Sequence, residues 1–172
     1  MINDTKERYG VISKIFHWLM ALLVGWQLLK LGDRIADGKH WVGETLVPWH
    51  VSIGTLLLAL IVLRIIWALV QRKKRPQPPE NAFLVKAGHG LMYAVMLVLP
   101  LTGVMYLVGK GYGLKAFDVQ LIAGGEKTAW LAELGHNHST LAWILAALVV
   151  GHIVIALVHH FIKRDGILRR ML

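Results

Sequence analysis

The stretch that decides the fold is HSTLAWILAALVVGHIVIALVHHFI, residues 138–162. It contains no aspartate, glutamate, lysine or arginine, and it exceeds the length of about 20 residues that a helix needs to cross a bilayer. Yet His138, His152, His159 and His160 all lie within it. Because an ionisable side chain inside a membrane is costly and usually functional, this stretch predicts a transmembrane helix that carries a functional site.

Three further apolar stretches lie upstream, at about 15–31, 50–70 and 87–108. The first is the weakest of them, since it holds His17, Gln27 and Lys30. No small-residue cleavage site follows it, so we interpret it as a retained helix rather than a signal peptide. Together with 138–162, these stretches predict an all-α membrane protein, a four-transmembrane-helix bundle in a single domain covering residues 1–172.

The composition agrees with a membrane protein. Of the 172 residues, 56% are hydrophobic and 17% are charged, whereas soluble domains carry about 25% charged residues. The chain has no cysteine, which excludes disulfides, iron–sulfur clusters, thiolate-ligated haem and covalent c-type haem attachment. The net charge of +9 comes from basic residues beside the apolar stretches, so it points to membrane orientation and not to nucleic acid.

The connections between the predicted spans differ in character. We expect residues 32–49 to form a polar loop. Residues 71–86 contain four consecutive basic residues and three prolines, so this linker cannot be helical throughout. Residues 109–137 begin glycine-rich, and we expect one short surface helix over 127–134.

The distribution of lysine and arginine predicts the orientation. With four spans, both termini and the 71–86 linker share one side, which has 12 basic residues: Lys6, Arg8, Lys14, Arg72, Lys73, Lys74, Arg75, Lys86, Lys163, Arg164, Arg169 and Arg170. The other side has six: Lys30, Arg34, Lys39, Lys110, Lys115 and Lys127. The positive-inside rule therefore predicts that both termini are cytoplasmic. Six acidic residues on the outer side make that side nearly neutral.

The intramembrane histidines form two pairs by depth. His138 and His152 are 14 residues apart, so they share one helix face and lie about 21 Å apart along the axis. The first predicted span begins inside and the second begins outside, which puts His17 at the inner depth and His50 at the outer depth. Depth alone therefore pairs His50 with His138 and His17 with His152.

Two imidazoles on facing helices suit a six-coordinate haem iron, and such a site transfers electrons because no axial position is open. Zinc is the rival metal, but a zinc site normally takes three or four clustered protein ligands. Two separated pairs fit zinc poorly. The plain structural alternative for each single histidine is a hydrogen bond to a neighbouring helix.

Three further residues are candidates near the inner pair. Arg64 lies 14 residues after His50 and should reach the inner depth, where a haem propionate would neutralise it; the alternative is that it snorkels to the cytoplasmic headgroups. His89 lies at the inner depth and suits a hydrogen bond to a propionate or a quinone better than a third ligand. His159 follows His152 by seven residues on the same face and is a candidate for the same two partners.

Two glycines and three histidines complete the candidates. Gly54 lies one turn from His50, and Gly103 lies farther along the third span; small residues at such places let a flat macrocycle approach a helix, although they also serve plain packing. The remaining histidines are interpreted as surface residues: His40, His136 and His160.

The motifs around these histidines resemble the bacterial di-haem cytochrome b561 family. The resemblance rests on the segments Phe16–Leu19, His50–Gly54, Gly88–His89, His138–Ala142, Gly151–His152 and His159–His160. The opening Glu7–Ser13 and the ending Asp165–Met171 also resemble that family. The similarity covers nearly the whole chain, and the motifs are specific in combination although each is weak alone.

This resemblance implies two haems b, with His17, His50, His138 and His152 as the axial ligands of the iron. It also implies a multi-pass protein of the bacterial inner membrane that exchanges electrons with ubiquinone. Family members include a superoxide oxidase, so superoxide is one candidate for a periplasmic-side donor, and the chain would then be an oxidoreductase of the superoxide:quinone type. The expected partners are membrane lipid, ubiquinone and an electron donor whose identity stays open, and nucleic acid is not among them.

Two other functional classes stay open at this point. The wider group includes cytochrome b subunits that anchor a larger dehydrogenase or hydrogenase complex. A transporter or metal-binding membrane protein without haem is the third class.

Overall fold

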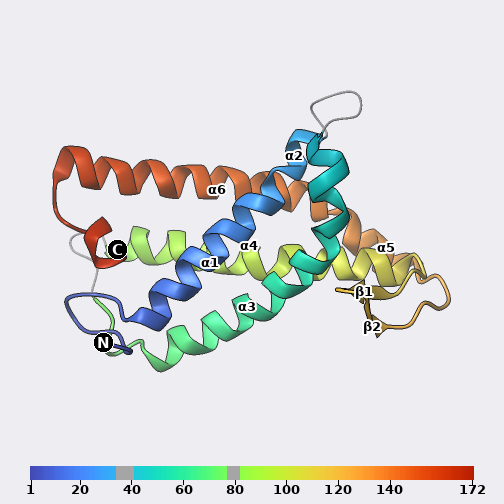
Figure 1. The fold of residues 1–172 in the computed structure, drawn as a ribbon, viewed down its shortest axis with the longest axis horizontal. Helices are drawn as coiled ribbons and strands as arrows, with labels where there is room; N and C mark the ends of the chain where they lie inside the picture. The colour runs from blue at the N-terminus through green and yellow to red at the C-terminus, as the bar shows by residue number, and fades with distance from the viewer. Residues whose placement is uncertain (34–40, 77–81) are drawn as a thin grey trace.

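The structure, a computed structural model, describes residues 1–33, 41–76 and 82–172. Four long helices dominate it: α1 (Val11–Leu28), α3 (His50–Val70), α4 (Ala82–Gly109) and α6 (His138–Val158) (Figure 1). Each is part of a helical segment long and apolar enough to cross a membrane. The predicted all-α, four-span architecture is therefore confirmed.

Several helix ends differ from the predicted spans. α1 begins at Val11 instead of about 15, and α4 begins at Ala82 instead of about 87. The expected polar loop at 32–49 is wrong for its second half. A π-helix (Val42–Leu46) and a 3₁₀-helix (Val47–Trp49) lead directly into α3. Pro48 is compatible with this, because proline is tolerated in the first turn of a helix.

The end of the bundle away from both termini, which the sequence predicts to be the outer end, holds a β-hairpin that the sequence analysis did not predict. β1 (Leu114–Ala116) pairs antiparallel with β2 (Val119–Ile122). The two turn residues, Phe117 and Asp118, have φ values of 47° and 63°. Two consecutive positive φ values are the mark of the tight hairpin turn that usually contains Asn-Gly, so the Phe-Asp pair gave no turn signal.

The helix expected over 127–134 is present as α5 (Ala129–His136). α5 packs closely against the outer end of α4, and two glycines permit the approach. A Cβ at Gly135 would lie 2.5 Å from Cα of Tyr106, and one at Gly109 would lie 2.3 Å from the backbone nitrogen of Ala132. No side chain fits at such distances, so glycine is required at both positions.

The helices pack as a series, α1 on α3, α3 on α4 and α4 on α6. The small core at these contacts consists of Met20, Val24, Ile53, Leu57, Ile61, Val95 and Leu145. Along the described residues of these helices, α6 barely touches α1 or α3. The histidine pairs lie where α6 faces those two helices across this loosely packed region.

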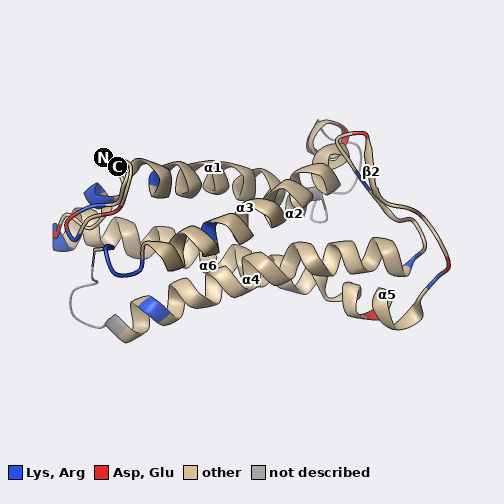
Figure 2. Ribbon diagram, turned by 90° about the horizontal axis from the view of Figure 1, so that it is seen from below, with Lys and Arg blue, Asp and Glu red and all other residues tan. Residues whose placement is uncertain are grey.

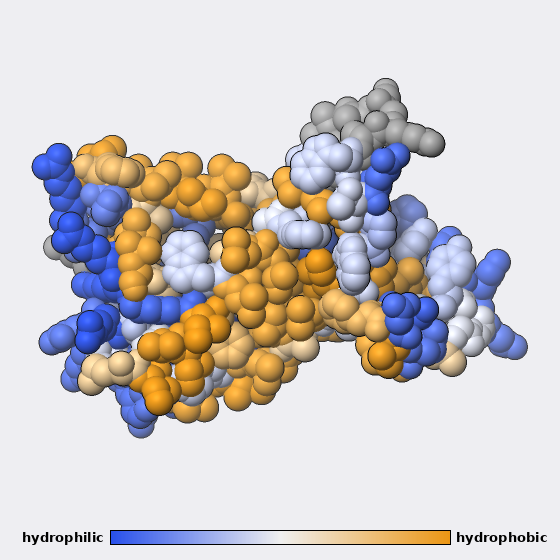
Figure 3. Space-filling model, in the orientation of Figure 1, coloured by the Kyte–Doolittle hydropathy of each residue, from blue (hydrophilic) through white to orange (hydrophobic). Residues whose placement is uncertain are grey.

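The surface is divided into an apolar middle and polar ends. Figure 3 shows apolar residues along the helices and hydrophilic residues at both ends of the molecule. Figure 2 shows Lys and Arg gathered at the end where both termini lie. Many large apolar side chains of α1, α3 and α6 are exposed on the surface of the chain. This is expected for helices that are surrounded by the hydrocarbon of a membrane.

Candidate cofactor sites

The outer pair combines the first residues of two helices. His50 begins α3 and His138 begins α6, and their ring centroids lie 5.8 Å apart. Nδ1 of His138 lies 2.8 Å from the carbonyl oxygen of Leu99 and 3.3 Å from Oγ1 of Thr102, both on α4. Donation of Nδ1–H to that carbonyl leaves the lone pair on Nε2. A metal-binding histidine normally has this arrangement, with its second nitrogen donating to a carbonyl.

Both glycines named in the sequence analysis accommodate protein side chains. A Cβ at Gly103 would lie 3.0 Å from Cε1 of His138, so the absence of a side chain lets this imidazole lie against α4. A Cβ at Gly54 would lie 3.4 Å from Nε2 of Gln27, and that amide donates a 2.8 Å hydrogen bond to the carbonyl oxygen of His50. These contacts show that the glycines serve side-chain packing; that they also make room for a macrocycle stays a prediction.

The inner site brings three imidazoles together. The ring centroids of His17 on α1 and His152 on α6 lie 6.2 Å apart, and the ring of His89 on α4 lies 5.6 Å from that of His152. Nδ1 of His89 lies 2.8 Å from the carbonyl oxygen of Val85, one turn earlier on α4. The ring of His89 is therefore anchored to its own helix, with the Nε2 edge left for another partner.

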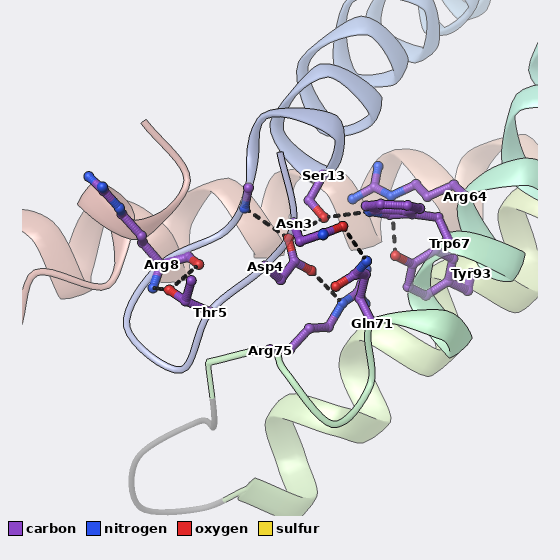
Figure 4. A network of polar contacts seen from close by, with 11 residues as sticks. Asn3, Asp4, Thr5, Arg8, Ser13, Arg64, Trp67, Gln71, Arg75 and Tyr93 are labelled. Atoms are coloured by element: carbon purple, nitrogen blue, oxygen red, sulfur yellow. Dashed lines mark hydrogen bonds and ion pairs between the residues drawn. The ribbon is translucent and has the colours of Figure 1, made fainter. Parts of the chain in front are cut away.

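Arg64 lies directly beside the inner pair. Its Nη2 is 3.2 Å from Nδ1 of His17, and its Nη1 approaches Sδ of Met20 at 3.8 Å. Its Nε donates to the hydroxyl of Tyr93 at 3.1 Å (Figure 4). Within the described residues, no carboxylate forms an ion pair with this guanidinium. A half-buried cation in an apolar helix usually pairs with an anion or another polar group, so this guanidinium is a candidate partner for an anionic group at the inner site.

The other candidate histidines lie apart from the two pairs. His159 follows α6, and its Nδ1 lies 2.5 Å from Oδ2 of Asp165. The ring of His136 lies 6.4 Å from that of Tyr106 at the outer end. His40 falls outside the described residues.

A buried polar network at the inner end escaped the sequence analysis. Asp4, whose exposed fraction is 3%, accepts hydrogen bonds from the backbone of Gly10 at 2.8 Å and from Ser13 at 2.6 Å, and it pairs with Nε of Arg75 at 3.1 Å. Trp67 of α3 donates to the same Ser13 hydroxyl at 2.9 Å (Figure 4). The only sequence signal was an acidic residue among basic ones, because the network depends on tertiary contacts.

The C-terminal segment is fastened to α1 beside the inner pair. The indole of Trp18, next to His17 in sequence, donates to the carbonyl oxygen of Met171 at 3.0 Å. The backbone of Tyr9 donates to the carbonyl oxygen of Arg170 at 3.2 Å. Burial raises the pKa of the Tyr9 phenol, so this side chain is neutral at physiological pH.

The paired histidines fit a planar metal cofactor. Two imidazoles that hold one metal between them at about 2.0 Å each place their ring centroids about 6 Å apart, close to the 5.8 and 6.2 Å observed. Nδ1 of His50 is buried and has no hydrogen-bond partner among the described residues. No group of three or more His, Cys, Asp or Glu in those residues could hold a metal ion. Each pair of imidazoles would therefore hold a haem iron between them, and this fits the residues better than a zinc site does.

Four apolar helices with paired imidazoles at two depths define a membrane cytochrome of the b type. Comparison with known proteins agrees. Residues 8–172 match the family described as prokaryotic cytochrome b561. The chain therefore belongs to the prokaryotic cytochrome b561 family of membrane electron-transfer haem proteins, and it is a multi-pass protein of the bacterial inner membrane.

Individual relatives cover almost the whole chain. Cytochrome b561 homolog 2 of Escherichia coli (strain K12) is 33% identical over 180 residues, which is 99% of this chain and 94% of the relative. Cytochrome b561 homolog 1 of the same organism is 30% identical over 96% of this chain and 97% of its own length. The probable superoxide oxidase CybB of Yersinia pestis is 26% identical over 96% of each chain.

Proposed function

We propose that the chain is a di-haem cytochrome b that transfers electrons from a donor on the outer side to ubiquinone. His50 and His138 would hold the outer haem, and His17 and His152 the inner haem. The observation that carries this proposal is that α6 contributes one imidazole to each of two facing pairs, at 5.8 and 6.2 Å between centroids. When bound, the haems supply the one-electron redox chemistry, while the protein supplies spacing and electrostatics.

The protein groups around each pair have distinct roles in this proposal. The Leu99 carbonyl holds the His138 ring in the tautomer whose Nε2 can bind iron. Arg64 contributes a positive charge beside His17, which suits a haem propionate. Such a cation near the inner haem favours its reduced form, because reduction adds negative charge there.

We place quinone reduction at the inner side, with Arg64, His89 and His159 nearby. A quinone needs hydrogen-bond donors and a source of protons as it becomes quinol, and histidine is the side chain that titrates nearest neutral pH. The described residues place the ring of His89 beside His152 and the ring of His159 at the end of the same helix. These histidines are thus available at the inner end, where the termini would face the cytoplasm.

Superoxide is the candidate donor, supported by the relative named as a probable superoxide oxidase. The six basic residues of the outer side are matched by six acidic ones, so net charge gives no long-range attraction for the superoxide anion. The chain would then act as an oxidoreductase of the superoxide:quinone type.

A second candidate function is a membrane anchor for a larger dehydrogenase or hydrogenase. The outer hairpin favours it, because its side chains Phe117, Val119 and Leu121 are about half exposed, at 48–59%. Exposed apolar side chains at the end of a bundle suit contact with another protein. Co-purification of a soluble partner with the tagged chain would support this function.

One experiment tests the proposed electron route. The purified holoprotein is mixed with a superoxide-generating system and a short-chain ubiquinone, and haem reduction and quinol formation are followed together. The proposal predicts haem reduction within the mixing time and quinol formation that depends on the protein. Haem reduction by dithionite but not by superoxide would reject superoxide as donor, and reduced haems that fail to reoxidise with ubiquinone would reject the acceptor.

A further inference from the structure

The turn after α6 brings a carboxylate back onto His159. The helix changes to π geometry over His159–Lys163, and Arg164 then adopts the left-handed conformation with φ 52° and ψ 33°. This reversal sets Oδ2 of Asp165 at 2.5 Å from Nδ1 of His159, while Oδ1 accepts a 3.1 Å bond from the backbone of Ile167. π-Helices are rare, and many of those that occur lie at functional sites. A non-glycine residue in the left-handed conformation, such as Arg164, is also uncommon.

In the His159–Asp165 pair, the imidazole is the hydrogen-bond donor and the carboxylate is the acceptor. The hydrogen bond from His159 is the main cause that lowers the pKa of Asp165, and the nearby Lys163 lowers it further. The carboxylate is therefore ionised at neutral pH and keeps a proton on Nδ1 of His159. That leaves Nε2 as the imidazole nitrogen that does not contact Asp165, and histidine is the side chain most often used for proton transfer near neutral pH. The side chains are 23% and 29% exposed, so water reaches both.

The pair lies at the inner end of the proposed electron route. His159 follows His152 by seven residues, so it shares the same face of the helix about 10 Å farther along the axis. The segment beyond Asp165 continues to α1, where Met171 accepts the hydrogen bond of Trp18 beside His17. The turn is therefore linked to His152 through the helix and to His17 through the hydrogen bond between Met171 and Trp18.

We propose that His159 and Asp165 form a proton relay for quinol formation at the inner site. The proposal rests on the proposed function, since it assumes that ubiquinone accepts the electrons there. Ubiquinone takes up two protons and two electrons, and bound haems would supply these electrons one at a time from the outer one-electron donor. Nε2 of His159 delivers protons to the quinone oxygens and is reprotonated from cytoplasmic water. Asp165 acts as a positioning residue that stabilises the imidazolium between these transfers.

The test separates proton transfer from electron transfer. The holoprotein is reduced anaerobically and mixed either with a short-chain ubiquinone, which needs protons, or with ferricyanide, which needs none. Positioned acids and bases contribute about 10²–10⁴-fold to rates. We expect Asp165→Asn and His159→Ala to slow haem reoxidation by ubiquinone at least tenfold, with unchanged reoxidation by ferricyanide and unchanged haem spectra. The deficit should shrink as the pH is lowered, because buffer acids then replace the relay.

The neighbouring His160 provides a matched control. Its ring packs against Phe161 with centroids 4.8 Å apart, so His160→Ala should keep the wild-type rate with both acceptors. Wild-type quinone rates in both test variants would overturn the relay alone. So would equal losses with quinone and ferricyanide, which would indicate a structural role. A wild-type protein oxidised by ferricyanide but not by ubiquinone would overturn the proposed function, and the relay with it.

Discussion

At the outer pair, one glycine decides how closely His138 can lie to α4. Gly103 leaves 3.0 Å between a hypothetical Cβ and Cε1 of His138, whose Nδ1 bonds to Leu99 on the same helix. A side chain there must displace the ring or break that hydrogen bond. The position of this proposed ligand is therefore set jointly by α4 and by its own helix.

Replacing Gly103 with valine tests this dependence. We expect Gly103→Val to lower the haem content from two towards one per chain and to shift the spectrum of the outer haem only. The matched control is Gly88→Val, on the same helix with no atom within 4 Å of its Cβ position. Equal haem content in the two variants, measured by pyridine haemochrome, would contradict the assignment of His138 as a ligand.

The pairing of Asp165 with His159 also has a direct signature at the residue scale. The hydrogen bond from His159 lowers the pKa of Asp165, so His159→Ala should raise that pKa towards its ordinary value of 3.8. A lowered carboxyl pKa stabilises the folded turn above the ordinary pKa, and that contribution is lost as the pH falls through the lowered value. Carbon-13 NMR of the aspartate carboxyls measures the shift, and no change in His159→Ala would refute the pairing.

At the scale of elements, the N-terminal segment holds the inner ends of α1 and α3 together. The buried Asp4 carboxylate accepts hydrogen bonds from Gly10 and Ser13 and forms an ion pair with Arg75. Trp67 of α3 joins this network by donating a hydrogen bond to Ser13. α1 packs on α3 but hardly on α6. The direction in which α1 presents His17 therefore depends on this attachment.

Asp4→Asn should weaken the attachment. It leaves Arg75 without its carboxylate and replaces a charged acceptor by an amide, which costs about 1–3 kcal/mol for a group of this kind. A lower thermal midpoint and a changed inner-haem potential are expected, with the outer potential unchanged. Glu7→Gln, at an exposed position of the same segment, is the control. A stability equal to that of the control would show that the network does not hold the segment.

The contrast between these elements shows what the sequence can predict. Helical periodicity and bilayer depth were enough to place His50 with His138 and His17 with His152, and the structure brings these rings together; their role as ligands stays a prediction. The hairpin after Gly113 was not predictable, because its turn pair Phe117-Asp118 lacks the Asn-Gly or Asp-Gly pattern of such turns and β2 is exposed at every residue. The Asp4 network and the Asp165 pair were also missed, since both depend on chain reversals that carry no periodic signal.

At the scale of the whole molecule, the basic residues gather at the end that holds both termini (Figure 2). The 12-to-6 ratio of Lys and Arg between the two sides predicts that this end is cytoplasmic. A reporter active only in the cytoplasm, fused after Leu172, should give signal, and a fusion in the Gly124–Gly125 segment should not. The reverse pattern would exchange the inner and outer assignments and move the proposed quinone site to the periplasmic side.

The most direct test of the account is the number and spin state of haems in the purified chain. Two facing imidazole pairs predict two haems b per polypeptide, both six-coordinate and low-spin, measured by pyridine haemochrome against protein mass and by electron paramagnetic resonance of the oxidised protein. Changing either residue of one pair to alanine should remove or convert one haem and leave the other low-spin. A single haem per chain, or high-spin iron in the resting wild-type protein, would contradict the claim that each pair holds its own haem.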